Sequence, residues 1–163
     1  MPNVNDAMLE ILNGRYYATL ATLNTDGSIH MTPVWFLFEN DRLFVQTSST
    51  SRKVKNIADR PEVSLTVDVR RLGSEKWVCA SGTAEIIRDK ESKQITAKIH
   101  RRYLTKAALE DPRVGPVMAA GGDIIIAITP KTWRSWDMKS FDEQFFCGLL
   151  TPSPEKWFLP LDG

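Results

Sequence analysis

The feature of this sequence that most constrains its fold is a two-residue alternation of side-chain character that returns in several short segments. In residues 62–69, "EVSLTVDV", Val63, Leu65, Val67 and Val69 alternate with polar or charged neighbours. Successive side chains of a β-strand point to opposite faces of a sheet, so this pattern predicts a half-buried strand. Further strands are predicted at residues 15–23, 29–38, 43–47, 76–87 and 123–129.

Turn residues between these segments indicate that neighbouring strands run antiparallel. Asp26-Gly27 separates the first two predicted strands, and this dipeptide is typical of tight hairpins. Pro33 has no N–H to donate, which predicts an edge strand, a bulge or a break where a ligand approaches. Gly82, inside a predicted strand, indicates a bulge or a close backbone approach. About six short strands joined by tight turns favour a barrel or sandwich over a doubly wound sheet.

Helical patterns occur between the strands and follow ordinary start and stop signals. Asn5 or Asp6 is suited to cap the first helix, and Asp89 is suited to cap the longest one. Pro61 ends a short helix in the middle of the chain, and Pro130 is expected to end the last strand. The aromatic tail after Trp136 predicts no regular structure. The three predicted helices are residues 5–14, 54–60 and 88–104.

Length and charge exclude several classes of protein. The 163 residues are expected to form one domain, residues 1–163, with a core at about 7–136 and a tail, 137–163, that packs on a dimer or on a pocket. A net charge of +1 gives no bulk electrostatic attraction for nucleic acid. No apolar run approaches the roughly 20 residues of a membrane span. The N-terminus lacks the features of a signal peptide, which predicts a cytoplasmic protein without a membrane partner.

The inventory of reactive side chains is small. Cys79 and Cys147 lack metal-ligand spacing, and His30 and His100 lie far apart in sequence. These residues give little material for a zinc site or a Ser-His-Asp triad, so no metal is expected. His30 is interpreted as a surface residue, and the sequence identifies no catalytic acid–base residue.

One polar stretch, "TSSTSRKVKN" at residues 47–56, concentrates hydroxyl groups and then cations. Ser51 is placed to cap the following helix, whose N-terminus carries a partial positive charge. Arg52 can bind two phosphate oxygens at once, and Lys53 adds a point charge. Thr47 ends the preceding strand, where its hydroxyl faces the same spot, and Lys55 extends the basic surface. The pattern predicts a phosphate-binding cradle. A capped helix with a solvated basic face and a nucleic-acid patch remain open alternatives.

The order of these elements resembles a known family. Thr47 is followed by Ser51-Arg52-Lys53, and Arg60-Pro61 closes the helix before "EVSLTV". Together with "ATLNTDGSIHMTPVWF" and the later "AITPKTWRSWD", this resembles the pyridoxamine 5'-phosphate oxidase-like FMN-binding split barrels, also called the flavin/deazaflavin oxidoreductase superfamily. The resemblance covers roughly residues 7–136.

The resemblance implies a mainly β fold, a six-stranded antiparallel split β-barrel with short helices. It also implies a homodimer with two cofactor sites at the interface. The phosphate would lie on the cradle, the flavin ring along "TPVWF", and a Trp and an Arg would come from the partner subunit. The implied cofactor-binding residues are Thr32, Pro33, Val34, Trp35, Thr47, Ser51, Arg52, Lys53, Lys55, Trp133 and Arg134.

The same resemblance implies an oxidoreductase that passes hydride between FMN and a small conjugated or heteroaromatic substrate. In such enzymes the cofactor carries the hydride chemistry. The deazaflavin coenzyme F-420 is the alternative cofactor, and its acidic tail would need additional cations. The candidates for that role, for which surface ion pairs are the simpler interpretation, are Arg70, Arg71, Lys76, Arg101 and Arg102.

The chain also departs from the family pattern. Pyridoxamine-phosphate oxidases proper carry an Arg and a Lys in the second strand, whereas this strand reads "IHMTPVWFLF". The ending "RSWDMKSFDEQFFCGLL" differs from their basic C-terminal segment, so synthesis of pyridoxal phosphate is not expected. Two other functions stay open: a flavin- or haem-binding module without turnover, and an interaction protein that has lost its ligand.

Overall fold

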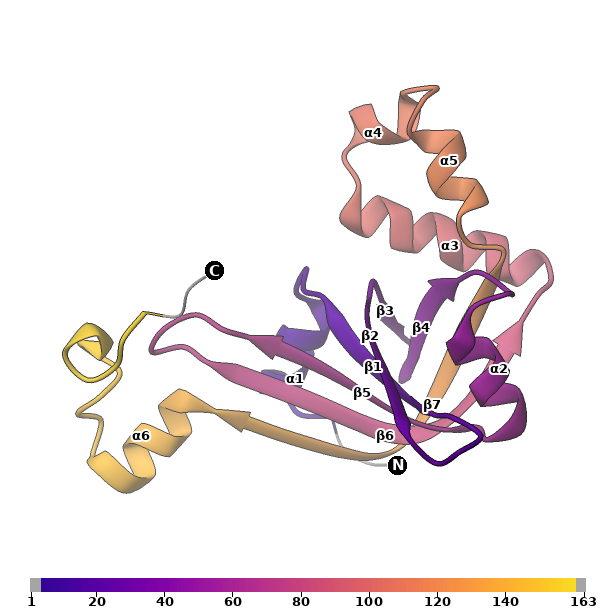
Figure 1. The fold of residues 1–163 in the computed structure, drawn as a ribbon. Helices are drawn as coiled ribbons and strands as arrows, with labels where there is room; N and C mark the ends of the chain where they lie inside the picture. Colours follow the sequence, from indigo (N-terminus) through magenta and orange to yellow (C-terminus); the bar gives the residue numbers. More distant parts are fainter. Residues whose placement is uncertain (1–3, 161–163) are drawn as a thin grey trace.

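The chain forms one antiparallel sheet that curls into a half-barrel, with short helices around it (Figure 1). The computed structural model describes residues 4–160. The strand order is β2-β1-β5-β6-β7-β4-β3, and the expected mainly β split-barrel class is confirmed. The strands are β1 (Ala18–Leu23), β2 (Ile29–Val34), β3 (Leu37–Glu39), β4 (Arg42–Thr47), β5 (Glu62–Val69), β6 (Lys76–Ile87) and β7 (Ile124–Asp137). The helices are α1 (Asp6–Asn13), α2 (Arg52–Asp59), α3 (Lys90–Tyr103), α4 (Lys106–Glu110), α5 (Gly115–Ala120), α6 (Met138–Phe146) and the short 3-10 helix η1 (Pro154–Lys156).

The sheet has seven strands rather than six because the segment predicted as one strand at 29–38 breaks in two. Trp35 and Phe36 separate β2 from β3, and these two strands lie at opposite edges of the sheet. Two residues can join the two edges only if the sheet curls until its edges approach each other. Pro33 lies on the edge strand β2 and pairs with Thr19 of β1. Of the three alternatives predicted for this proline, an edge strand, a bulge or a break where a ligand approaches, the structure shows the edge strand, which tolerates a missing N–H.

The prediction that the last strand ends at Pro130 was wrong, because β7 continues beyond it to residue 137. The pairing with β6 shifts at this point: Gly82 pairs with Pro130, whereas Ser81 pairs with Thr132. Lys131 is thus the extra residue of a β-bulge. A proline fits here since a bulge interrupts the hydrogen-bond ladder. The bulge predicted at Gly82 is confirmed.

Two apolar clusters explain why the run "IIIAI" of β7 is buried throughout. Its side chains at 124, 126 and 128 belong to the cluster inside the half-barrel, together with Leu20 and Leu65. Those at 125 and 127 pack on the other side with Ile95 and Ile99 of α3. Helix α3 therefore covers the outer face of β7 and β4, as Figure 1 also shows. The predicted caps of the first and longest helices form, with Asn5 bound to Met8 N and Asp89 to Glu91 N.

Two segments have structure that the sequence did not predict. Helices α4 and α5 form between α3 and β7, and α6 with η1 forms an arm beyond the end of β7 (yellow in Figure 1). In the arm, the buried carboxylate of Asp142 accepts hydrogen bonds from Leu150 N at 2.9 Å and Thr151 N at 2.7 Å. The terminal residues 1–3 and 161–163 of the expected domain lie outside the described residues. Within residues 4–160, no helix is long and apolar enough to cross a membrane.

Candidate functional site

A cavity of about 400 Å³ lies where the corner after β2 meets β4 and the start of α2. Residues far apart in the sequence line it: Tyr17, Pro33, Val34, Trp35, Gln46, Lys53 and Met118. Four of these, at positions 33, 34, 35 and 53, belong to the expected cofactor-binding set. Sequence reasoning missed the other three. The position of Gln46, a polar residue directly before Thr47 in β4, was the only signal that pointed to one of them.

Three side chains of the predicted cradle are joined by hydrogen bonds. The Thr47 hydroxyl donates to Ser51 Oγ at 3.2 Å and accepts from Lys53 Nζ at 3.4 Å. Ser51 stands at the predicted N-cap position of α2, but its side chain makes no capping hydrogen bond. The predicted position of Ser51 is therefore confirmed, but its predicted capping hydrogen bond is wrong. The hydroxyl contacts Thr47 instead. The Val54 N–H donates to the Ser51 carbonyl oxygen, so the N–H groups of Arg52 and Lys53 are the ones that Ser51 leaves available to another acceptor.

Lys53 is the charged group of this cavity. Its side chain is half-buried, and the burial lowers the pKa of its ammonium group. Among the residues that the structure describes, no carboxylate forms an ion pair with it. A partly desolvated cation with only a hydroxyl partner favours the binding of an anion.

The other two cations of the cradle lie apart from Lys53. Arg52 is exposed and lines a separate hollow of about 350 Å³ with His30 and the turn after β1. Lys55 is also exposed, farther along α2. Adjacent residues of a helix point in different directions, which explains why Arg52 and Lys53 line different hollows.

The strand predicted to pass along a ligand has one unsatisfied polar atom. Thr32 Oγ1 is buried and has no hydrogen-bond partner among the described residues. After it, the Trp35 ring stacks on Tyr103 with ring centroids 4.9 Å apart and nearly parallel planes. The Tyr103 hydroxyl in turn donates to Tyr16 O at 2.7 Å. The corner is thus anchored by α3, and Thr32 itself is not among the residues that line the cavity.

Trp133 and Arg134 do not reach the cavity within one chain. They lie on β7 opposite Ala80 and Cys79 of β6. Trp133 packs edge-on against Phe38 at 5.9 Å between ring centroids, and Arg134 is exposed.

Polar contacts of Asn56 and Ser49 hold the cradle in place, and no periodic pattern in the sequence predicted them. Asn56 is 4% exposed, and its Nδ2 donates to Thr22 Oγ1 at 3.0 Å and Asn24 Oδ1 at 2.9 Å. This pair of bonds ties α2 to β1. Ser49 donates from its backbone N and its hydroxyl to Asp123, each at 2.7 Å, and these bonds lower the pKa of the Asp123 carboxyl.

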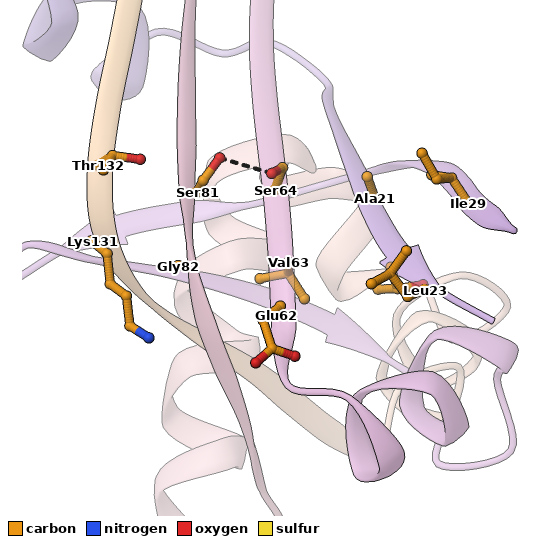
Figure 2. Close-up of a pocket in the computed structure, with 11 residues that line it drawn as sticks. Ala21, Leu23, Ile29, Glu62, Val63, Ser64, Ser81, Gly82, Lys131 and Thr132 are labelled. Carbon is orange, nitrogen blue, oxygen red and sulfur yellow. Dashed lines mark hydrogen bonds between the residues drawn. The ribbon is translucent and has the colours of Figure 1, made fainter. Parts of the chain in front are cut away.

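A second hollow of about 460 Å³ lies on the outer face of the sheet and is lined mostly by small and apolar side chains (Figure 2). Ser64 and Ser81 share a hydrogen bond of 2.8 Å across it, and Glu62 and Lys131 lie at one end. Ile29 lines this hollow and is 65% exposed. Such a face is typical of an interface between protein chains. In residues 4–160, no group of three or more His, Cys, Asp or Glu is placed to hold a metal ion.

Comparisons with known proteins agree with this fold. A family model described as pyridoxamine 5'-phosphate oxidase matches residues 4–137. None of the curated proteins compared with the chain matches it.

Several solved structures share the architecture. A conserved hypothetical protein from Mycobacterium tuberculosis is 22% identical with a TM-score of 0.71, and the match covers 86% of this chain and 89% of that one. An F420 reductase is 24% identical with a TM-score of 0.63, covering 80% of this chain and 98% of the other. An FAD-binding protein from Mesorhizobium loti is 17% identical with a TM-score of 0.59, covering 81% and 94%. At these identities the likeness establishes the fold.

Proposed function

The chain belongs to the pyridoxamine 5'-phosphate oxidase family, and on this premise we propose that it is an FMN-dependent oxidoreductase acting on a small conjugated or heteroaromatic substrate. The observation that carries the proposal is Lys53, a half-buried ammonium group whose pKa is lowered and which has no carboxylate partner among the described residues. A phosphate group would supply the missing negative charge.

The proposed binding mode uses the contacts around α2. Thr47, Ser51 and Lys53 hold the phosphate beside the uncapped first turn of the helix. Arg52, being exposed, can turn towards the outer side of the same phosphate, and Lys55 adds to the positive potential.

The segment from Thr32 to Trp35 lies along the flavin ring in this proposal. The backbone groups of Thr32, Val34 and Trp35 offer hydrogen bonds to the ring's polar edge. Pro33, Val34 and Trp35 line the cavity and exclude water from one side of it. FMN, when bound, supplies the hydride-transfer chemistry.

FMN is favoured over the deazaflavin coenzyme F-420 because three of the five cations suggested for an acidic tail are already engaged. Arg70 pairs with Asp68. Lys76 pairs with Glu10 at 2.6 Å, and Arg102 donates to Leu12 O at 2.8 Å. Pyridoxamine-phosphate oxidation itself is not proposed, since β2 carries neither Arg nor Lys.

We further propose a homodimer, formed through the apolar outer face of the sheet, with the cofactor at the interface. The exposed side chains of Ile29 and Met31, at 65% and 62%, would be covered there. Trp133 and Arg134 would then complete the partner's site. The arm after β7 exposes Phe145 and Trp157, which a dimer or the pocket could cover.

A module that binds flavin or haem without turnover is the second candidate. One observation favours it: among the residues that line the cavity, only Tyr17 and Lys53 are titratable. A substrate that needs proton transfer would depend on one of these two groups or on the partner subunit.

Titration of FMN into the purified protein tests the proposal. The wild-type protein is expected to bind FMN with a dissociation constant in the micromolar range or below. Lys53→Ala should weaken binding by roughly 10- to 100-fold, as expected for a charge-assisted contact to phosphate. Lys90→Ala on α3 is the matched control and should change affinity little, because this side chain is exposed, lies outside the cavity and has no part in the proposed site.

Equal affinities of the Lys53→Ala and wild-type proteins would contradict the proposed phosphate site. An acceptor panel with a reducing source then separates the two candidates. Reduction of an acceptor by the FMN-loaded protein indicates an oxidoreductase, and tight binding without reduction of any acceptor indicates the module.

A further inference from the structure

Gln46 is held in a fixed orientation by contacts to two residues that do not line the cavity. Its Oε1 lies 2.7 Å from Nε2 of His100, and its Nε2 donates to the carbonyl oxygen of Gly122 at 3.3 Å. His100 is 6% exposed and belongs to α3. A side chain at position 122 would collide with the Gln46 amide, so the glycine leaves the room that Gln46 occupies.

These contacts determine which atoms donate. The Gly122 carbonyl can only accept a hydrogen bond, so it must face the amide nitrogen of Gln46 and not the amide oxygen. The oxygen therefore faces His100, which must carry its proton on Nε2 in order to donate. The alternative amide orientation would place two acceptors against each other at Gly122.

The environment of His100 agrees with a neutral ring. Burial lowers the pKa of its imidazole. Its ring also lines a hollow of about 490 Å³ between α3 and α5, and Lys93 and Asp123 are the charged residues there. A neutral imidazole with Nε2–H is the form that the Gln46 contact requires.

We propose that His100 is a positioning residue: through Nε2–H it fixes the Gln46 carboxamide so that an amide N–H is presented to a hydrogen-bond acceptor in the cavity. One of the two amide hydrogens binds Gly122, and the other has no partner among the described residues. Gln46 lines the same cavity as Lys53 and Trp35. A carbonyl oxygen of the flavin ring is an acceptor of this kind, and this identification of the ligand rests on the proposed function.

The first test measures the tautomer directly and needs no ligand. Long-range proton–nitrogen NMR spectra distinguish imidazoles protonated on Nε2 from those protonated on Nδ1. The chain has only two histidines, and a His30→Gln variant assigns both signals. The expected result at neutral pH is a neutral Nε2–H tautomer for His100 that persists when FMN is added. A neutral Nδ1–H tautomer would overturn the proposal whether or not the protein binds flavin.

The second test uses FMN affinity in a set of variants. Gln46→Leu and His100→Leu should each weaken binding about three- to tenfold, the size expected for one neutral hydrogen bond. Because His100 acts through Gln46, the double variant should bind no more weakly than Gln46→Leu alone. His100→Gln retains an N–H donor and should bind within about twofold of wild type. His30→Gln serves as the control and should bind like wild type.

The outcomes separate the two proposals. A wild-type protein that binds no FMN refutes the proposed function, and the NMR measurement still decides on His100. A wild-type protein that binds FMN, combined with additive losses in the double variant or with no rescue by His100→Gln, refutes the positioning role. If His100→Leu does not fold, His100→Gln and the tautomer measurement remain as tests.

Discussion

At the scale of single residues, the candidate site depends on polar groups that are only partly satisfied within the chain. Lys53 has a hydroxyl as its hydrogen-bond partner, and Thr32 Oγ1 has none among the described residues. Partly buried polar groups without full partners cost stability, and an anionic ligand with acceptor atoms would remove that cost. Of these two residues only Lys53 lines the cavity, and its ammonium group distinguishes this cavity from the mostly apolar hollow on the outer face of the sheet.

The lowered pKa of Lys53 predicts how FMN affinity changes with pH. Burial disfavours the ammonium form, so Lys53 loses its proton below the ordinary lysine value of 10.5. The affinity for FMN should consequently fall as pH rises through that lowered pKa. In Lys53→Arg the charge persists, since arginine stays protonated throughout this range, so the alkaline fall should be absent. Fluorescence titrations of both proteins from pH 7 to about 10 measure the difference, and parallel curves would contradict the prediction.

The same pKa shift also makes the stability of the ligand-free protein depend on pH. The unfolded chain binds the Lys53 proton more tightly than the folded protein does. The free energy of unfolding due to this group therefore increases as pH rises from the lowered pKa towards 10.5. Bound phosphate favours the ammonium form and should reduce that dependence.

At the scale of secondary-structure elements, the β-bulge at Lys131 determines the course of the two longest strands. It lets Pro130 lie inside β7 and brings Gly82 against the backbone of the neighbouring strand. Bulges bend a strand and increase its twist. The bend lets β7 pair with β4 along its first half and with β6 along nearly its whole length.

Gly82→Ala should destabilise the protein by about 1–3 kcal/mol, the usual range for overpacking. A Cβ at this position would lie 2.9 Å from Pro130 Cα and still closer to Thr129 O, and both are backbone atoms. Gly121→Ala is the matched control, because the nearest atoms to its added Cβ lie 3.5 Å away and its φ is −69°. Denaturant unfolding of both variants measures the effect, and equal midpoints would show that the bulge accommodates a side chain.

At the scale of the whole molecule, the proposed site extends over two subunits. The cradle and the positions 133 and 134 lie on different parts of one chain, and in the proposed dimer a partner subunit would bring them together. The apolar outer face in Figure 2 offers the surface for such a contact.

Mixed dimers test this arrangement. Lys53→Ala and Arg134→Ala are each expected to weaken FMN binding in pure form. When the two variants are mixed and exchange subunits, each mixed dimer should contain one intact site and one doubly altered site. Tight binding should therefore return with a stoichiometry of one site per mixed dimer. No recovery, or a monomer in sedimentation experiments at micromolar concentration, would contradict a shared site.

Much of the fold follows from the sequence because its signals are local. The alternation of residues 62–69 and the Asp26-Gly27 turn depend only on neighbouring residues, and they predicted β5 and the first hairpin. Pro33 left an edge, a bulge or a ligand-facing break open, and the structure shows the edge. The stretch 47–56 likewise contained the contacts among Thr47, Ser51 and Lys53, because strand end, loop and helix start are contiguous. The split of 29–38 and the extension of β7 past Pro130 were not predicted, since both depend on strand pairing.

The sequence by itself thus determined the β class, the polar cradle and the lysine within it. Only the tertiary structure decided which distant residues join that cradle. Curling of the sheet brings the corner at Trp35 beside Gln46 of β4, and packing of α3 places His100 against Gln46. No local pattern predicts these contacts, because they depend on how separated strands and helices pack.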